Sequence, residues 1–157
     1  PQSNRQHDDW LSFFVEERLV NMANQAVSAG RADRSLLRRL DKMGEVLKSR
    51  LPEPVHPSLL HGDIWSANVL AERGRITGFI DPAIYYGHPE IELAFITLFS
   101  TFGRGFYERY NAARPIAPGF FEERRDIYNL FPLLVHVTLF GGGYFSSVDR
   151  TLNKLGV

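Results

Sequence analysis

The chain has 157 residues, of which 44% are hydrophobic and 13% aromatic, enough to bury a core as one domain. Its 18 basic and 18 acidic side chains cancel, which excludes a global field that would attract nucleic acid or anionic lipid. The lack of Cys excludes disulfides and thiolate metal sites and is compatible with a reducing compartment. No apolar run approaches the roughly 20 residues of a membrane span, and no signal peptide is recognisable, so we expect a cytoplasmic protein. The first residue, Pro1, is compatible with a chain cut from a longer one or with loss of an initiator Met.

The first third of the chain predicts helices. Asp8 or Asp9 can cap a helix whose apolar residues recur at helical spacing from Trp10 to Met22, and "SAGRAD" (28–33) ends it. Asp33 can cap a second helix with apolar positions from Leu36 to Leu47. The segment "LPEPVHP" (51–57) is expected to be an extended connector, because three prolines in seven residues exclude a regular helix.

The middle of the chain predicts a β-hairpin, and the remainder predicts further helices. Val69–Ala71 and Ile76–Ile80 are short β-like runs on either side of the turn sequence "ERGR". Three helical stretches are expected after it: Glu90 to about Thr101, Pro118 to about Leu139 with a kink at Pro132, and Val148 to Leu155. The predicted fold class is therefore mainly α with one small β-hairpin.

The stretch "HGDIWSANVL" (61–70) carries polar side chains that packing does not need. Asp63 and Asn68 lie on a loop before the first predicted strand, and Asp81 ends the second strand. Because an antiparallel hairpin returns the chain to its start, we expect Asn68 and Asp81 to lie close together. Their oxygens would suit Mg²⁺ that also binds phosphate, and Asp63 could accept a proton from an attacking hydroxyl, as kinases require. His61 would brace this loop through its ring nitrogens.

These residues resemble the catalytic region of the fructosamine (ketosamine) kinases, within the aminoglycoside-phosphotransferase-like and protein-kinase-like superfamily. The pattern His-x-Asp-x-x-x-x-Asn with a downstream Asp is typical of the superfamily. The Trp after the loop Asp and the run "GFIDPAIYYGHPEIELA" (78–94) resemble the ketosamine branch. Similar stretches at "PQSNR", "DDWLSFFVEERL" and "APGF" extend the resemblance over nearly the whole chain.

The resemblance implies a role for each of these positions. Asp63 would be the catalytic base for a sugar hydroxyl, and Asn68 and Asp81 would be the Mg²⁺ ligands. Trp65 would lie beside the sugar, although a core aromatic is an equal alternative. Apart from what the resemblance implies, His88 is a candidate for a direct contact with the substrate, with an ordinary structural role as the alternative. The family's chemistry is ATP-dependent phosphorylation of the 3-hydroxyl of a sugar attached to an amine, which makes the adduct labile and repairs glycated protein. ATP, Mg²⁺ and a ketosamine are therefore the expected partners.

Two acidic residues begin the helix that follows this region. Glu90 and Glu92 suit the positive end of a helix dipole, and Glu92 is expected to support the catalytic loop.

The resemblance also implies that residues 1–157 are the helical carboxy-terminal lobe of a two-lobed kinase, with the catalytic loop at 61–68. The amino-terminal lobe, with its phosphate-covering loop and the Lys that holds the ATP phosphates, is not recognisable. "GRG" (103–105) and "GGG" (141–143) follow apparent helices and do not match a phosphate-binding context. A lobe on its own would expose the apolar surface that meets the other lobe, which predicts self-association.

Two other interpretations stay open. A phosphoesterase could use His61, Asp63, Asp81 and His88 as a dinuclear metal site, and it would cleave phosphoesters without ATP. The chain could instead be a non-catalytic lobe that binds a ketosamine but cannot hold ATP. The basic run "RADRSLLRR" (31–39) is interpreted as a solvated helix face because the total charge is neutral. Neither nucleic acid nor a membrane is an expected partner.

Overall fold

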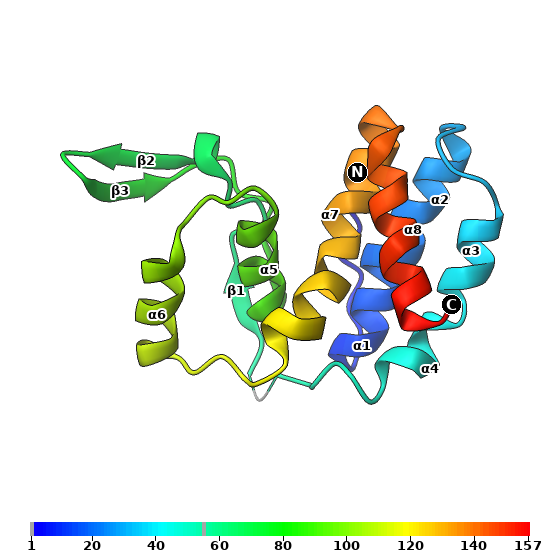
Figure 1. The fold of residues 1–157 in the computed structure, drawn as a ribbon, viewed down its shortest axis with the longest axis horizontal. Helices are drawn as coiled ribbons and strands as arrows, with labels where there is room; N and C mark the ends of the chain where they lie inside the picture. Colours follow the sequence, from blue (N-terminus) through cyan, green and yellow to red (C-terminus); the bar gives the residue numbers. More distant parts are fainter. Residues whose placement is uncertain (1, 55) are drawn as a thin grey trace. The chain divides into compact units, whose positions relative to one another are not determined.

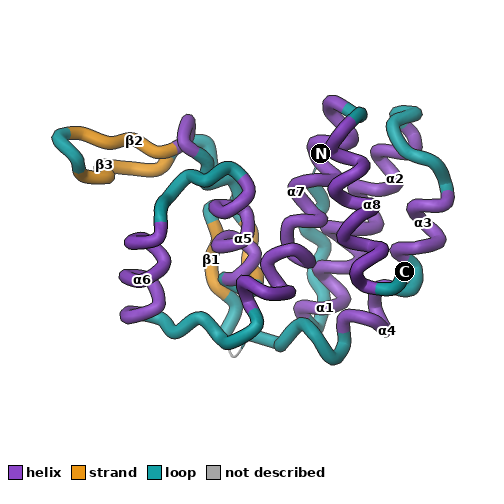
Figure 2. Tube along the Cα trace, viewed as in Figure 1, coloured by secondary structure: helices purple, strands orange, loops and turns teal. Residues whose placement is uncertain are grey.

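The structure is a computed structural model that describes residues 2–54 and 56–157. Pro1 and Val55, which belong to the predicted chain start and connector, lie outside the described residues. The chain folds into two compact units, one of residues 1–53 and 130–157 and the other of residues 54–129. Helices dominate the first unit, and both short sheets belong to the second (Figures 1 and 2).

All the regular elements in the described part of the first unit are helices. Its elements are α1 (Trp10–Phe13), η1 (Phe14–Val20), α2 (Asn21–Ser28), α3 (Ser35–Leu40), α4 (Met43–Leu47), most of α7 (Arg125–Phe140) and α8 (Gly143–Leu155). The predicted cap at the first helix is confirmed, since Asp9 Oδ1 accepts a hydrogen bond of 2.7 Å from the Ser12 N–H. The helix ends at Ser28, as "SAGRAD" predicts.

The predicted second helix is wrong in one respect, because the structure divides it into α3 and α4. The Lys42 N–H bonds to the Arg39 carbonyl, three residues back, so the chain tightens there and starts a new turn. The apolar spacing continues across this break. The core of this unit includes Phe14, Leu19, Leu36, Leu40, Met43, Leu47, Leu134, Val137, Val148 and Leu152.

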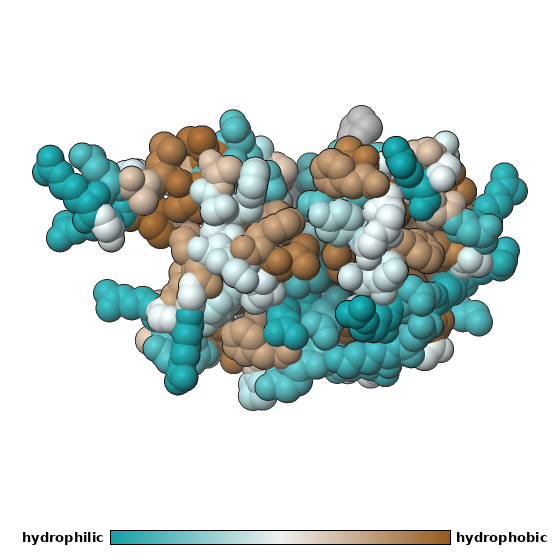
Figure 3. All heavy atoms as spheres, turned by 45° about the horizontal axis from the view of Figure 1, so that its top comes forward, coloured by the Kyte–Doolittle hydropathy of each residue, from teal (hydrophilic) through white to brown (hydrophobic). Residues whose placement is uncertain are grey.

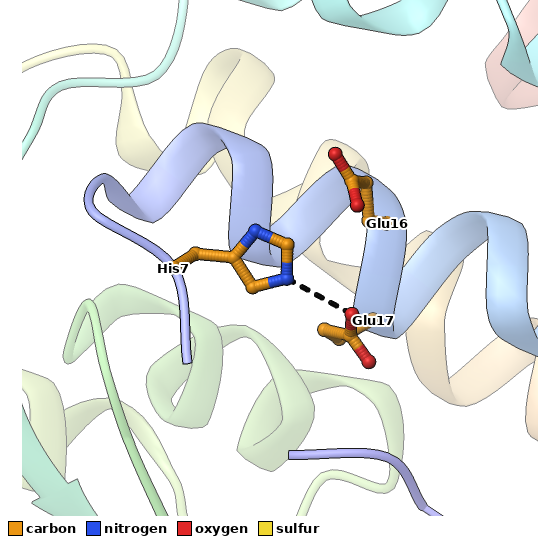
Figure 4. Close-up of side chains that lie close together, drawn as sticks. All are labelled: His7, Glu16 and Glu17. Carbon is orange, nitrogen blue, oxygen red and sulfur yellow. Dashed lines mark hydrogen bonds and ion pairs between the residues drawn. The ribbon is translucent and has the colours of Figure 1, made fainter. Parts of the chain in front are cut away.

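The segment before α1 is held against η1 by a buried carboxylate (Figure 4). Glu17 is 1% exposed, and its Oε1 accepts hydrogen bonds of 2.9 Å from Arg5 Nε and from His7 Nε2. Burial alone would raise the pKa of Glu17, but hydrogen bonds from Ser3, His7 and Arg5 outweigh it and lower the pKa to about 2. Glu17 is therefore a buried anion that its neighbours neutralise.

The second unit contains the strands and the helices around them. Its elements are β1 (Ser58–Leu60), η2 (Ser66–Asn68), β2 (Val69–Glu72), β3 (Arg75–Phe79), β4 (Tyr85–Gly87), α5 (Glu90–Leu98), α6 (Arg104–Ala113) and η3 (Phe120–Arg124). The predicted hairpin is confirmed: β2 and β3 pair antiparallel, with Val69 opposite Phe79. A second antiparallel pair, β1 with β4, was not predicted, because each strand has only three residues.

The helices after the hairpin differ from the prediction in three places. Helix α6 was missed: none of its residues is buried, so its sequence carries little of the apolar periodicity that reveals a helix. The region predicted as one helix from Pro118 to about Leu139 forms η3 and α7. Pro132 lies inside α7, and the kink expected there stays a prediction. The last helix begins at Gly143, earlier than its apolar residues indicate. Within the described residues, no helix is both long and apolar enough to cross a membrane.

Candidate active site

The loop of residues 61–68 joins β1 to the hairpin and is fixed at its start. The His61 ring accepts a hydrogen bond at Nδ1 from the Asp63 N–H (3.3 Å) and lies 2.9 Å through Nε2 from the Ile80 carbonyl oxygen. A carbonyl can only accept, so Nε2 carries the proton in this arrangement. The ring of His61 thus connects the start of the loop to the end of β3.

Glu92 holds the same loop from α5. Its two carboxylate oxygens accept hydrogen bonds from the backbone N–H groups of His61 (3.1 Å) and Gly62 (2.6 Å). Burial raises the pKa of Glu92, while the two N–H groups act in the opposite direction. The carboxylate therefore fixes two successive peptide groups immediately before Asp63.

Gly62 is required where the loop meets the segment after β3. The His61 carbonyl accepts a hydrogen bond of 2.8 Å from the Ala83 N–H, which draws the two segments together. Gly62 has φ +81°, and a Cβ there would lie 2.3 Å from the Ala83 carbonyl oxygen. A side chain is excluded on both counts.

Asn68 is positioned by Asp63. Its Nδ2 donates to the Asp63 carbonyl oxygen and to Asp63 Oδ2, both at 2.9 Å. Because both partners are acceptors, the amide nitrogen must face Asp63, and Oδ1 is the atom directed elsewhere. Asn68 is buried, with 6% exposed. Its side chain therefore orients the Asp63 carboxylate and keeps one oxygen as a potential ligand atom.

The hairpin brings Asp81 back toward Asn68. The Asn68 carbonyl accepts a hydrogen bond of 3.0 Å from the Ile80 N–H, so the pairing of β2 and β3 extends one residue beyond the strands. Asp81 follows directly and is exposed. Its φ is +52°, a left-handed conformation that non-glycine residues adopt rarely and that is frequent at functional sites.

The donor set at this end of the hairpin fits Mg²⁺. An amide oxygen from Asn68 and a carboxylate from Asp81 are hard oxygen ligands, and Mg²⁺ is commonly held by one or two such groups together with phosphate oxygens. The orientation of the Asn68 amide, with its nitrogen on Asp63, directs an oxygen rather than an N–H away from Asp63. These two residues are the ones that would hold the ion.

Trp65 and His88, both predicted to contact substrate, have different surroundings. Trp65 is 41% exposed and so is not a core aromatic. His88 is buried, stacks on Tyr128 with ring centroids 5.9 Å apart, and accepts a hydrogen bond at Nδ1 from the Glu90 N–H. These contacts place His88 at the start of α5, and its contact with substrate stays a prediction.

Comparison with known proteins gives a consistent result. The family model described as fructosamine kinase matches residues 1–156. The chain belongs to the fructosamine kinase family. A protein named probable ketoamine kinase from Lactiplantibacillus plantarum is 38% identical over 155 residues, which cover 97% of this chain and 54% of that protein. The ketosamine-3-kinase of Mus musculus is 35% identical over 162 residues, covering 98% of this chain and 50% of the mouse protein.

A solved structure shows the same fold. A protein from Thermobifida fusca, assigned as a fructosamine-3-kinase, superimposes with a TM-score of 0.82 at 32% sequence identity. The match covers 99% of this chain and 54% of that one. The chain thus spans about half the length of the fructosamine kinase family members that it matches.

The dinuclear site of a phosphoesterase is not assembled. Among the described residues, the only three His, Asp or Glu side chains close enough together to hold one ion are His7, Glu16 and Glu17 (Figure 4). Arg5 Nε donates to the same Glu17 oxygen that His7 contacts, so a guanidinium already neutralises that carboxylate. The phosphoesterase interpretation is therefore not favoured in this member of the fructosamine kinase family.

A buried ion pair at the start of α5 was not predicted from the sequence. Glu90, interpreted only as a helix-start acid, receives hydrogen bonds of 2.7 Å on each oxygen from Arg124 Nε and Nη2. The pair fastens the start of α5 to η3, and α5 carries Glu92. The two residues lie 34 positions apart, so no local spacing indicates their contact.

Apolar side chains gather at the base of the β2–β3 hairpin, next to its hydrophilic tip (Figure 3). Four large side chains of this region are exposed by 39% to 49%: Leu70, Ile76, Phe79 and Ile80. The patch adjoins Asn68 and Asp81 along the chain. A surface of this kind is a common site of contact with a ligand or another protein surface.

Proposed function

We propose that this chain supplies the catalytic loop and metal ligands of an ATP-dependent ketosamine kinase, which phosphorylates a sugar hydroxyl on a glycated amine. The observation that carries the proposal is the arrangement of Asp63 and Asn68, with Asp81 at the return of the hairpin. Kinases need an oriented carboxylate for the acceptor hydroxyl and separate oxygen ligands for the metal. The printed names of the relatives, which include ketosamine-3-kinase, support the same reaction.

In this proposal Asp63 positions the sugar hydroxyl and accepts its proton as the oxygen attacks the terminal phosphate of ATP. The hydrogen bond from Asn68 and the backbone anchors at His61 and Gly62 hold the carboxylate in place. Preorganisation of this kind accounts for much of the rate of phosphoryl transfer. Mg²⁺ on Asn68 and Asp81 would neutralise phosphate charge.

His61 and Glu92 act in the proposal as supports rather than as reacting groups. His61 connects the loop to β3 through both ring nitrogens, and Glu92 binds two of its N–H groups. Trp65, exposed two residues after Asp63, would provide an aromatic face for the sugar.

We infer further that the chain is the carboxy-terminal, helical lobe of a two-lobed kinase. The match to about half of each relative supports this, as does the absence from the sequence of a glycine-rich loop after a strand. The apolar patch at the hairpin would then meet another lobe or the nucleotide, and self-association through it stays a prediction that light scattering can test.

The decisive test is ADP release by this chain with Mg·ATP and a simple fructosamine. Asp63→Asn should reduce turnover by roughly 10²–10⁴-fold by removing the proton acceptor, with little change in nucleotide affinity. Asp81→Asn should instead weaken the metal-dependent part of nucleotide binding, and Asn tolerates the left-handed backbone. The exposed Asp41→Asn is the matched control. Full turnover in Asp63→Asn would contradict the assignment of the base.

The alternative function, a chain that binds a ketosamine without turning it over, is not favoured by the relatives, whose printed names are those of kinases. Calorimetric binding of a fructosamine without ADP release would favour this candidate, whereas turnover that depends on Asp63 would exclude it.

A further inference from the structure

A second exposed aromatic side chain lies beside Trp65. Phe99, at the C-terminal end of α5, is 37% exposed, and its ring centroid is 6.5 Å from that of Trp65 with the planes tilted by 54°. Phe95 contacts Phe99 edge to face, with ring centroids 5.2 Å apart. Trp65 and Phe99 therefore present two neighbouring, partly exposed aromatic rings.

The backbone holds Phe99 in this position. The Thr101 N–H bonds to the Ile96 carbonyl and the Ser100 N–H to the Thr97 carbonyl, the pair of bonds that closes a helix with a left-handed residue. That residue is Ser100, with φ +51°, although glycine is the usual choice. A non-glycine residue in this conformation is a local strain of the sort that gathers at functional sites.

The same segment is fastened to the catalytic loop. Thr101 Oγ1 donates a hydrogen bond of 3.3 Å to the carbonyl of Ile64, the residue after Asp63. The end of α5 is therefore tied to the loop in two ways, by the hydrogen bond of Thr101 to Ile64 and by the ring contact of Phe99 with Trp65. Trp65 follows Asp63 by two residues in the chain, and Phe99 is the ring that contacts Trp65.

We propose that Phe99 is a specificity-determining residue that packs on the aliphatic chain of the substrate's amine, as in glycated lysine. The inference rests on the proposed function, in which the reacting hydroxyl lies at Asp63 and the sugar packs on Trp65. The part of the substrate beyond the sugar then extends over Phe99. A methylene chain gains from burial on an aromatic face, whereas a sugar with an unsubstituted amine does not reach it.

The test compares two ligands on the full chain by isothermal titration calorimetry: fructosyl-lysine, and 1-amino-1-deoxyfructose, which lacks the methylene chain. Phe99→Ala should weaken the binding of fructosyl-lysine three- to tenfold and change the affinity for the second ligand less than twofold. Phe99→Leu, which keeps apolar bulk, should lie between wild type and Phe99→Ala, and it preserves the test if the alanine variant does not fold. Phe121→Ala is the matched control, since Phe121 is 40% exposed and contacts Tyr107 rather than Trp65.

The outcomes separate the two proposals. If Phe99→Ala weakened the binding of both ligands equally, or of neither ligand, the role of Phe99 would be overturned. Binding by the wild-type chain would still leave the proposed function standing. Failure of the wild-type chain to bind either ligand would overturn both. Selective loss of fructosyl-lysine with Phe121→Ala unchanged is the result expected.

Discussion

The Asn68 amide nitrogen donates to both the carboxylate and the backbone carbonyl of Asp63, at 2.9 Å each. One side chain thereby orients the proposed base and directs its own oxygen toward the position proposed for the metal. If the proposed roles hold, proton acceptance by Asp63 and metal binding by Asn68 depend on the same amide group.

Asn68→Ala should therefore affect stability, turnover and metal-dependent binding together. Removing a buried donor leaves the Asp63 acceptors short of a partner, which should lower the free energy of unfolding by about 1–3 kcal/mol. Turnover should fall at least tenfold because the base loses its orientation. Chemical denaturation and ADP release measure the two effects, with the exposed Ser66→Ala as control. A variant that retained full turnover would show that Asn68 does not orient the base.

Gly62→Ala should disrupt the loop through its backbone alone. The new Cβ would lie 2.3 Å from the Ala83 carbonyl oxygen, at φ +81°, so the loop or the segment after β3 must move. We expect a loss of about 2–4 kcal/mol in unfolding free energy and loss of turnover.

Gly44→Ala is the matched control for this substitution. Gly44 lies inside α4 with open space around it, so alanine there should raise stability by about 1 kcal/mol. Thermal unfolding compares the two variants. If Gly62→Ala were as stable as wild type, the close approach to Ala83 would not be a constraint on the loop.

The hairpin was predictable from the sequence because it depends on local pattern. Alternating β-like runs around "ERGR" predicted the pairing that brings the residues after β3 back to Asn68. The cap at Asp9 was equally local. Features that depend on distant partners were not predictable in this way. The ion pair of Glu90 with Arg124 is one example, since either residue alone reads as an ordinary surface charge.

The prediction of secondary structure failed where buried residues do not recur with a regular period. Helix α6 buries none of its residues, and β1 and β4 are three residues each and pair across a long loop. Phe99 was missed for another reason. An aromatic residue at the end of an apolar helix is ordinarily interpreted as a core residue, whereas the structure shows that Phe99 is partly exposed next to Trp65.

Glu92→Gln should weaken the support of the loop of residues 61–68 while leaving the stability of the fold nearly unchanged. An amide has one acceptor oxygen, so it can serve only one of the N–H groups of His61 and Gly62. Burial raises the pKa of Glu92, so the folded chain favours the protonated form and disfavours the charged one. The stabilisation from the protonated form is fully present below the unfolded pKa and is lost as the pH rises through the folded pKa. Neutralising the side chain removes that penalty and offsets the lost hydrogen bond.

We therefore expect the unfolding free energy of Glu92→Gln to stay within about 1 kcal/mol of wild type, while kcat falls tenfold or more. The exposed Glu108→Gln, which breaks only a surface pair with Arg104, is the control. Urea unfolding and ADP release together decide the matter. Unchanged kcat would mean that Glu92 does not position Asp63.

The buried Glu17 predicts acid sensitivity of the first unit. Hydrogen bonds from Ser3, His7 and Arg5 outweigh burial and lower the pKa of Glu17 to about 2 from 4.5. A carboxyl whose pKa is lower in the folded chain stabilises it above the unfolded pKa, and this stabilisation disappears as pH falls from about 4.5 to about 2. Glu17→Gln should lower the unfolding free energy at pH 7 by about 2–4 kcal/mol, because a neutral amide accepts fewer and weaker hydrogen bonds from Ser3, His7 and Arg5 than the buried carboxylate does.

The difference between wild type and Glu17→Gln should therefore shrink as the pH is lowered through that window, and urea unfolding at a series of pH values measures it. Glu16→Gln is the matched control: Glu16 is the neighbouring residue, its side chain is 56% exposed, and its nearest cation is Arg5 at 3.8 Å. That variant should change stability by less than about 0.5 kcal/mol at any pH. A constant difference for Glu17→Gln between pH 7 and pH 2 would show that the carboxylate charge is not what holds the segment before α1.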